Sequence, residues 1–306
     1  MEKKTEIMPL IDLEDENVKQ EMFLLLKDRT TNNNIVWATN NYESHGKGYS
    51  DTDEITSNNL YSLDKNVIQP RVFKSAEIKA SRTKSKAEVF TPSWVCNDMN
   101  NMVDEEWFGY KNVFNKKICN SWETNKEKVR FPENKTLDDY IESTRLEITC
   151  GEAPFLVSRY DSSTGDIIPI ENRIGLLDRK LRLICENIDD KDEWFDKAVS
   201  AYKSIYGYEF QGDNLLIARI NLLMTFVEYY EYKFKEKPEN YCIDIIAFII
   251  SWNIWQMDGL KNKQPFSDKY ATIMDWGANK EIEFVSLIGE EVKDKKKSSK
   301  KTKKES

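Results

Sequence analysis

Three stretches of the chain place small or acidic residues directly after segments that resemble buried strands. In the first stretch, the strand-like residues 146–149 run into Cys150 and Gly151. A turn of small residues after a strand lets the backbone approach a ligand at the carboxyl edge of a sheet. A single glycine at this position also fits an ordinary turn, so both interpretations stay open.

The second stretch, residues 205–209, ends in an acidic side chain. Glu209 closes this segment and Phe210 follows it. A carboxylate at the end of a strand can accept hydrogen bonds from both hydroxyls of a ribose, as in dinucleotide-binding folds. Phe210 can pack against the face of a purine. A solvated carboxylate is an equally good interpretation of Glu209 taken alone.

The third stretch is the apolar segment 243–255, which is expected to run into a strand and is followed by Asp258 and Gly259. Asp258 at the end of such a strand can accept a hydrogen bond from the amino group of an adenine. The alternative is an aspartate that begins a turn before glycine, which is a common arrangement.

The elements that position these residues alternate between strands and helices over residues 141–276. This alternation predicts an α/β fold with a parallel, doubly wound sheet. Helices are expected at 91–102, 176–186, 193–204 and 213–234, and residues 154–160 can begin a further helix. A hairpin is expected where strands 270–276 and 281–288 flank the turn 277–280.

In chain order the three stretches resemble the cofactor-binding half of adenine-N6 DNA methyltransferases, especially modification subunits of restriction–modification systems (sequences labelled restriction endonuclease subunit M). The first family motif, roughly DPACGSGxFL, is matched by Glu147, Cys150, Gly151, Phe155 and Leu156. The second is matched by Tyr206, Gly207, Glu209, Ala218, Arg219 and Leu222, and the third by Asn253, Ile254, Asp258 and Leu260. Upstream, residues 88–95 resemble the Phe-Thr-Pro element of the family, so the resemblance covers about 86–262.

The resemblance implies a Rossmann-like fold that binds S-adenosylmethionine and acts on DNA together with a partner subunit of a restriction–modification system. Gly151 and its neighbours would hold the methionine side of the cofactor, Glu209 the ribose and Asp258 the adenine. The implied cofactor-binding residues are Phe90, Thr91, Pro92, Glu147, Cys150, Gly151, Ala153, Glu209, Phe210, Asp258 and Leu260.

The chain departs from the family pattern in two places. Glu147 replaces an aspartate, and Ala153 with Pro154 replaces the second glycine and the small residue after it. The catalytic Asn-Pro-Pro-Tyr type of motif is missing, because the sequence contains no Pro-Pro pair. The nearest candidates for catalysis are Asp275 and Trp276, whose alternative interpretation is the end of a hairpin strand. Catalytic residues are therefore not assigned from the sequence.

Composition limits the classes of function. The formal net charge is −8, and residues 293–306 hold eight lysines against two acidic residues, which leaves the rest near −14. A chain with this negative charge is expected to bind DNA poorly on its own, because lysine and arginine supply the non-specific affinity for the phosphate backbone. Five widely spaced cysteines without a CxxC pair argue against a zinc site or a disulfide framework. With no signal peptide and no apolar run long enough to span a bilayer, a soluble cytoplasmic protein is expected.

We expect three regions: a helical or irregular region at 1–85, a cofactor-binding domain at 86–290 that ends in a hairpin, and a disordered lysine-rich tail at 291–306. By family standards the sheet is expected to be incomplete, since few residues remain after Asp258, and a partner chain would then cover its exposed edge. Two hypotheses remain. The chain is a methyltransferase subunit that acts with a partner or an unconventional catalytic loop, or it is an inactive scaffold or sensor that binds cofactor or DNA.

Overall fold

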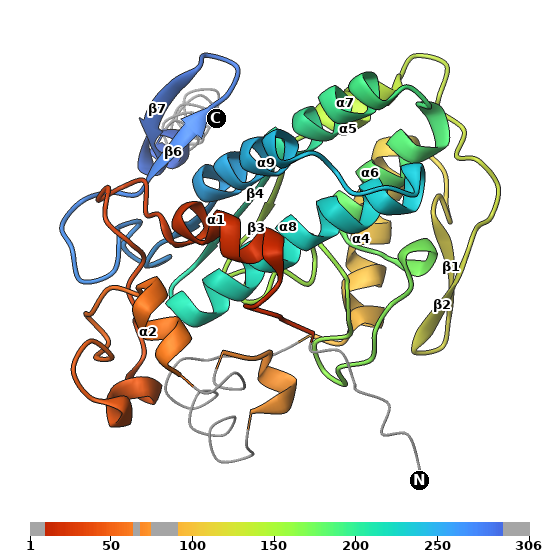
Figure 1. The fold of residues 1–306 in the computed structure, drawn as a ribbon. Helices are drawn as coiled ribbons and strands as arrows, with labels where there is room; N and C mark the ends of the chain where they lie inside the picture. Colours follow the sequence, from red (N-terminus) through yellow and green to blue (C-terminus); the bar gives the residue numbers. More distant parts are fainter. Residues whose placement is uncertain (1–9, 64–67, 75–90, 290–306) are drawn as a thin grey trace, which may run out of the picture.

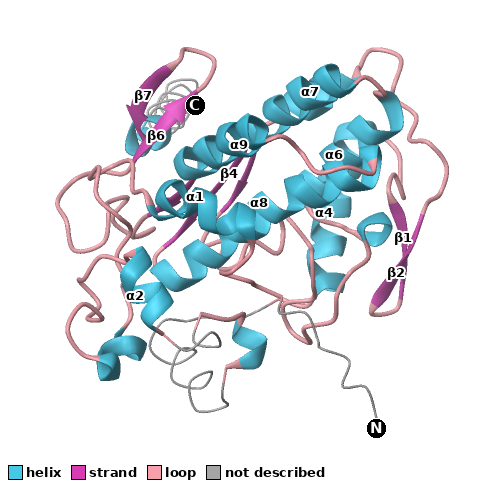
Figure 2. Cartoon of the chain, in the orientation of Figure 1, coloured by secondary structure: helices cyan, strands magenta, loops and turns pink. Residues whose placement is uncertain are grey.

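The computed structural model describes residues 10–63, 68–74 and 91–289. Three short parallel strands lie at its centre: β3 (Arg145–Glu147), β4 (Ile205–Glu209) and β5 (Ile254–Gln256). Their order in the sheet is β3-β4-β5, with β4 in the middle. Figure 2 shows β4 beside the helices α8 (Gly212–Phe234) and α9 (Asn240–Asn253). Leu146 pairs with Tyr206, and Tyr208 pairs with Trp255. The three strand-like stretches of the sequence therefore lie side by side and point the same way.

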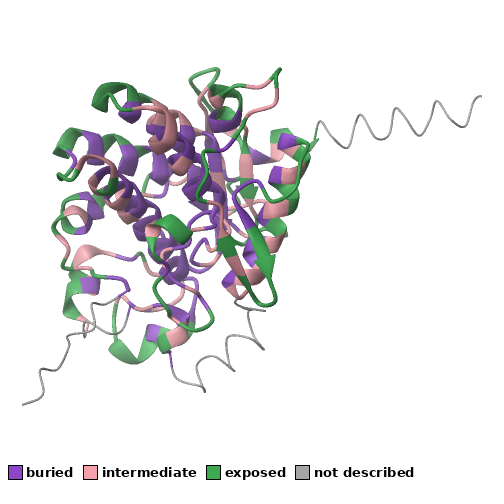
Figure 3. Cartoon of the chain, turned by 90° about the vertical axis from the view of Figure 1, so that its right-hand side faces the viewer, coloured by how far each residue is buried: buried purple, intermediate pink, exposed green. Residues whose placement is uncertain are grey.

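Helices make the crossovers between these strands. The pair α6 (Leu176–Asn187) and α7 (Lys191–Lys203) joins β3 to β4, and the pair α8 (Gly212–Phe234) and α9 (Asn240–Asn253) joins β4 to β5. Most residues of α8 are buried, because apolar side chains occur on nearly every face of it. The helices predicted at 176–186, 193–204 and 213–234 are confirmed. Figure 3 shows the buried residues gathered along these central elements.

The two faces of the sheet are covered differently. Ile205 and Ile254 pack into the hydrophobic core formed with the crossover helices. Tyr208 and Trp255 face the other way and pack with Phe284 and the hairpin of β6 (Thr272–Asp275) and β7 (Lys280–Glu283). The fold is therefore α/β with several small sheets, and a hairpin rather than a crossover helix covers the second face.

Two predicted elements differ from the structure. The second hairpin strand was expected at 281–288, but β7 ends at Glu283 and residues 284–289 are helical, because Phe284 turns into the core beside Trp255. Residues 154–160 form turns rather than the start of a helix. Their backbone forms hydrogen bonds outside any helix; for example, the Ser158 amide donates to the Asp178 side chain on α6.

The N-terminal residues pack onto the central elements. Helix α1 (Glu16–Leu26) begins at Asp15, whose side chain accepts hydrogen bonds from two backbone amides, and it contacts α8 and α9. Trp37 is fully buried. The Gln256 side chain bonds both the amide and the carbonyl of Val36, at 2.9 and 2.8 Å. Residues 10–63 thus share one core with the sheet; the predicted division into three regions stays a prediction, and the lysine-rich tail lies outside the described residues.

Short elements complete the described chain: η1 (Asn40–His45), α2 (Ser57–Ser62), η2 (Arg71–Phe73), α5 (Leu137–Glu142) and η3 (Ile170–Asn172). The helix predicted at 91–102 is present as α4 (Ser93–Phe108), but it begins after Pro92 rather than at residue 91 and continues beyond residue 102 to Phe108, where the left-handed backbone of Gly109 ends it. A hairpin of β1 (Asn115–Ile118) and β2 (Ser121–Thr124) follows and lies to the right in Figure 1. In the described ranges no helix combines the length and apolarity needed to cross a membrane.

Candidate functional site

A cavity of about 780 Å³ opens at the carboxyl edge of the three parallel strands. It forms there because parallel strands end at the same edge, where the turns after them leave a crevice. Eight of the eleven residues implied for cofactor binding line it: Thr91, Glu147, Cys150, Gly151, Glu209, Phe210, Asp258 and Leu260. Pro92 and Ala153 are not among its lining residues, and Phe90 lies outside the described residues.

The turn after β3 has an unusual backbone. Thr149, Gly151 and Ala153 adopt left-handed φ angles of 47°, 54° and 64°. Such angles favour glycine and cost other residues about 1–3 kcal/mol, and they concentrate at functional sites. The Cys150 amide donates to the Tyr208 carbonyl at 2.8 Å, which holds the turn against β4. A Cβ atom at Gly151 would meet nothing within 4 Å. The turn therefore leaves open space beside Gly151.

Glu209 links this turn to the start of α8. The side chain is buried, and its two oxygens accept hydrogen bonds from the Gly151 amide at 3.0 Å and the Gln211 amide at 3.1 Å. One carboxylate thus positions the turn after β3 and the turn after β4. A carboxylate offers about four acceptor positions, so it can also serve a ligand.

Glu147 lies beside Glu209 in a different environment. Its carboxylate accepts hydrogen bonds from the Phe155 and Leu156 amides, at 3.4 and 3.2 Å. Burial raises the pKa of Glu147 well above its usual range, and the nearby charge of Glu209 raises it further, although the two amides act against this. Glu147 therefore keeps its proton to a higher pH than an exposed glutamate.

The pKa of Asp258 is shifted in the opposite direction, below its usual value. Burial raises the pKa of its carboxyl group, but hydrogen bonds from the Lys261 side chain and the amides of Leu260 and Lys261 outweigh that effect and lower the pKa. The ion pair with Lys261 is 3.1 Å long. Asp258 is therefore a charged acceptor at neutral pH.

Gln211 is a residue of the cavity that the sequence analysis missed. Its side chain is 3% exposed, and its Oε1 atom is buried without a hydrogen-bond partner in the described part of the chain. Buried acceptors without partners are rare in folded proteins and each costs about 1–3 kcal/mol. This oxygen can therefore accept a hydrogen bond from a ligand. The available signal was position, because Gln211 follows Phe210 in the turn between β4 and α8.

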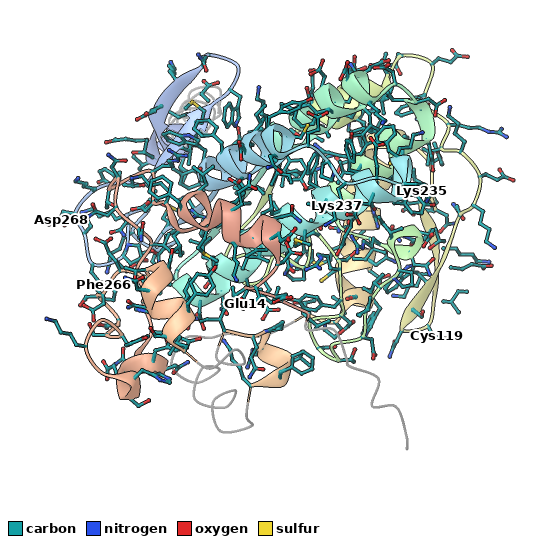
Figure 4. All side chains as sticks on the ribbon, in the orientation of Figure 1. Glu14, Cys119, Lys235, Lys237, Phe266 and Asp268 are labelled. Carbon is teal, nitrogen blue, oxygen red and sulfur yellow. The ribbon has the colours of Figure 1, made fainter. Side chains whose placement is uncertain are left out.

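A second aromatic residue lies near Phe210. Phe266 packs edge-on against it, with ring centroids 6.1 Å apart, and is 57% exposed (Figure 4). Aromatic faces next to a cavity suit a planar ligand group, because ring contacts add to the free energy of burying apolar area. Phe266 was not identified from the sequence, because a loop residue after Pro265 carries no pattern.

The structure places Asp275 and Trp276 away from this cavity. The Trp276 indole donates to Asn253 at 2.8 Å, and the Asn253 amide group donates to the carbonyls of Tyr202 and Ile205 at the amino end of β4. Asp275 accepts a hydrogen bond from the Ala278 amide within the hairpin. Both candidates thus lie at the edge of the sheet opposite the cavity, about 13 Å away along β4 at about 3.3 Å per residue.

The remaining chemistry of the cavity is limited. The Cys150 thiol is buried, and burial raises its pKa well above the usual range, which makes it a poor nucleophile. Over the described ranges no three His, Cys, Asp or Glu side chains gather as metal ligands.

Comparison of the chain with family models, with curated proteins and with solved structures found no match.

Proposed function

We propose that the cavity at the carboxyl edge of the sheet binds S-adenosylmethionine. The observation that carries this proposal is the convergence of three separate strand ends on one cavity: Glu147 and Gly151 at the end of β3, Glu209 and Phe210 at the end of β4, and Asp258 after β5. The cavity volume lies within the range of about 300–1,000 Å³ that small-ligand sites span.

The donors and acceptors suit the two ends of such a ligand. Glu209 presents a carboxylate that suits a vicinal diol, and the unpaired Gln211 Oε1 can accept from a hydroxyl or amino group. Phe210 offers a ring to a purine, and the charged Asp258 can accept from an exocyclic amino group. The open space beside Gly151 can hold the methionine part. When bound, the cofactor supplies a methyl group on a sulfonium.

The backbone at Ala153 adds support to the family resemblance. The family has a glycine at this position of its first motif, and Ala153 adopts the left-handed φ of 64° that glycine permits at little cost. The parallel order β3-β4-β5, with helical crossovers, is also compatible with half of a Rossmann-like sheet. That finer class is part of the proposal.

We further propose that methyl transfer to an adenine amino group in DNA needs a partner chain. Leu146 and Ile148, at the β3 side of the cavity, are 44% and 63% exposed. Among the described strands only β4 pairs with β3, so its other edge is open. Open strand edges are normally paired or covered, and a strand added there in parallel would bring its carboxyl end to the cavity. The alternative function, an inactive scaffold or sensor, is favoured by the distance of Asp275 and Trp276 from the cavity.

Calorimetric titration with S-adenosylmethionine tests the cofactor site in wild-type protein and in Gln211→Ala. Because Gln211 Oε1 has no hydrogen-bond partner among the described residues, this variant should keep its folding stability and bind about tenfold more weakly than wild type, the effect of one hydrogen bond. Glu209→Ala should bind S-adenosylmethionine at least about tenfold more weakly than Gln211→Ala does, since hydrogen bonds to charged groups are worth about 1.5–3 kcal/mol. Gln20→Ala on α1 is the matched control.

Two results would count against the proposal. If the wild-type protein binds no S-adenosylmethionine, the match to the family motifs reflects common ancestry and not a working cofactor site. Equal affinity in wild type and both cavity variants would place any bound cofactor elsewhere on the chain.

A further inference from the structure

The β1–β2 hairpin and its flanking loops form a basic segment on an acidic chain. Residues 111–135 contain seven basic and three acidic residues, a local charge of +4, whereas the whole chain carries −8. This segment forms no recognisable motif in the sequence, because its basic residues are spread among polar ones. The fold brings them together.

A groove of about 1,300 Å³ runs along this hairpin. Its lining includes Lys116, Lys126, Lys128 and Arg130, against the acidic Glu123 and Glu127. None of these four cations forms an ion pair with a described residue. Two neighbours do have partners: Lys117 pairs with Asp98, and Lys135 donates to the Trp107 carbonyl. The cations that line the groove are therefore those available to an anionic ligand.

The walls of the groove are held by hydrogen bonds to the rest of the fold. The Tyr110 hydroxyl donates to the Arg130 carbonyl at 2.9 Å. The Trp122 indole donates to the Asn172 carbonyl at 2.9 Å, and Arg182 on α6 donates to the Asn125 carbonyl at 2.7 Å. These contacts fix the loop on both sides of the hairpin, so the cations project from a defined surface.

We propose that this groove binds the phosphodiester backbone of DNA. Lysines and arginines on a protein surface gain affinity for a phosphate backbone by releasing its counterions, without reading base sequence. The proposal depends on the proposed function for the choice of DNA. Helix α4 connects the two sites, because Met99 lines the cavity and Phe108 lines the groove. Nine residues of helix separate them by about 14 Å, less than one turn of duplex DNA.

The first test is duplex DNA affinity, measured by fluorescence anisotropy over a range of salt concentrations. The full-length triple variant Lys116→Gln, Lys126→Gln, Lys128→Gln is compared with wild type. Each phosphate contact contributes about 0.9 to the slope of log affinity against log salt concentration. The magnitude of this slope should therefore be smaller by roughly 2–3 in the variant, and the variant should bind duplex DNA at least about tenfold more weakly than wild type near 0.1 M salt.

The matched control removes three exposed lysines elsewhere, Lys47→Gln, Lys237→Gln, Lys280→Gln, for the same change in net charge. It should keep the wild-type slope. An equal loss in both triple variants would mean that total charge, not the groove, governs binding and would overturn the proposal, as would an unchanged slope in the hairpin variant.

Cys119 gives a local readout. It lies exposed at the tip of the hairpin, whereas Cys96, Cys150 and Cys242 are buried and Cys185 is partly buried (Figure 4). Burial also raises the pKa of the Cys185 thiol to about 11, so a thiol-reactive fluorophore should label Cys119 first. Duplex DNA should change the emission of this label in wild type and not in the hairpin variant. No change in wild type would place DNA elsewhere.

The same samples separate this proposal from the proposed function. The hairpin variant should bind S-adenosylmethionine as wild type does, because its substitutions lie outside the cavity. Loss of DNA binding with intact cofactor binding supports the groove. A tenfold preference for RNA of the same sequence over duplex DNA would overturn the assignment of DNA.

Discussion

Glu147 and Asp258 line the same cavity, but their pKa values are shifted in opposite directions. Burial raises the pKa of Glu147, whereas Lys261 and two backbone amides lower that of Asp258. Environment thus separates two side chains with the same functional group, one tending to stay neutral and one charged. The neutral one supports the turn after β3 through the Phe155 and Leu156 amides, and the charged one holds the turn after β5 through Lys261 and the Leu260 amide.

Glu147→Gln tests this difference through stability. The folded-state pKa of Glu147 lies above its unfolded value of about 4.3. Between these two values the folded state holds a proton that the unfolded state has released, so rising pH favours unfolding. The free energy of unfolding of wild type, relative to Glu147→Gln, should therefore fall as pH rises above about 4.3. Urea denaturation at several pH values measures it, and a constant difference would contradict the assignment.

At the scale of elements, the first turn of α8 is held by the N-terminal segment. The Gly212 amide donates to the Trp37 carbonyl at 2.9 Å. A Cβ atom at Gly212 would lie 2.1 Å from the Val36 carbonyl oxygen, so the backbone there needs glycine. Because Glu209 and Gln211 precede this turn directly, residues 34–38 indirectly support the wall of the cavity.

Gly212→Ala should therefore disturb both stability and the cavity. Overpacking of this kind typically costs about 1–3 kcal/mol, and more where the close atom belongs to the backbone. Gly277→Ala is the matched control, since its nearest neighbour, the Asp275 side chain, would be 3.5 Å away. Chemical denaturation and cofactor titration measure the two effects. Equal stability of the two variants would argue against a tight contact between α8 and Val36.

The elements that could be predicted from the sequence are those with strong local patterns. The apolar run before β5, the spacing along α8 and the strand-like residues of β4 all specify their structure within a short window. The clustering of three strand ends followed from the parallel topology. The β1–β2 hairpin could not be predicted, since its residues Asn115–Ile118 and Ser121–Thr124 are mostly polar and lack alternation.

Other features depend on contacts between distant residues. The role of Gln211 depends on a missing partner for one oxygen, and the place of Trp276 depends on a hydrogen bond to Asn253. Sequence spacing contains neither fact. The packing of Trp37 against α8 likewise joins residues far apart in the chain, so the N-terminal region looked irregular in the sequence.

At the scale of the whole molecule, the cavity and the two catalytic candidates occupy opposite edges of one small sheet. Trp276 is held at the amino edge by Asn253, and the cavity lies at the carboxyl edge. Under the proposed function, we therefore expect the group that contacts both cofactor and target base to come from another chain. The open edge of β3, beside Leu146 and Ile148, is where a parallel strand would place such a group.

On this proposal the purified chain should bind S-adenosylmethionine but transfer no labelled methyl group from it to DNA. Addition of a modification subunit that carries an Asn-Pro-Pro-Tyr motif should restore transfer. The variant Leu146→Lys, Ile148→Lys should block that restoration, because charged side chains disfavour pairing at a strand edge. Both residues also line the cavity, so calorimetric titration must first show that this variant binds S-adenosylmethionine as wild type does. Phe23→Lys, at an exposed position on α1, should leave the restoration unchanged. Transfer by the chain alone, lost in Asp275→Asn, would instead identify the hairpin as an unconventional catalytic loop.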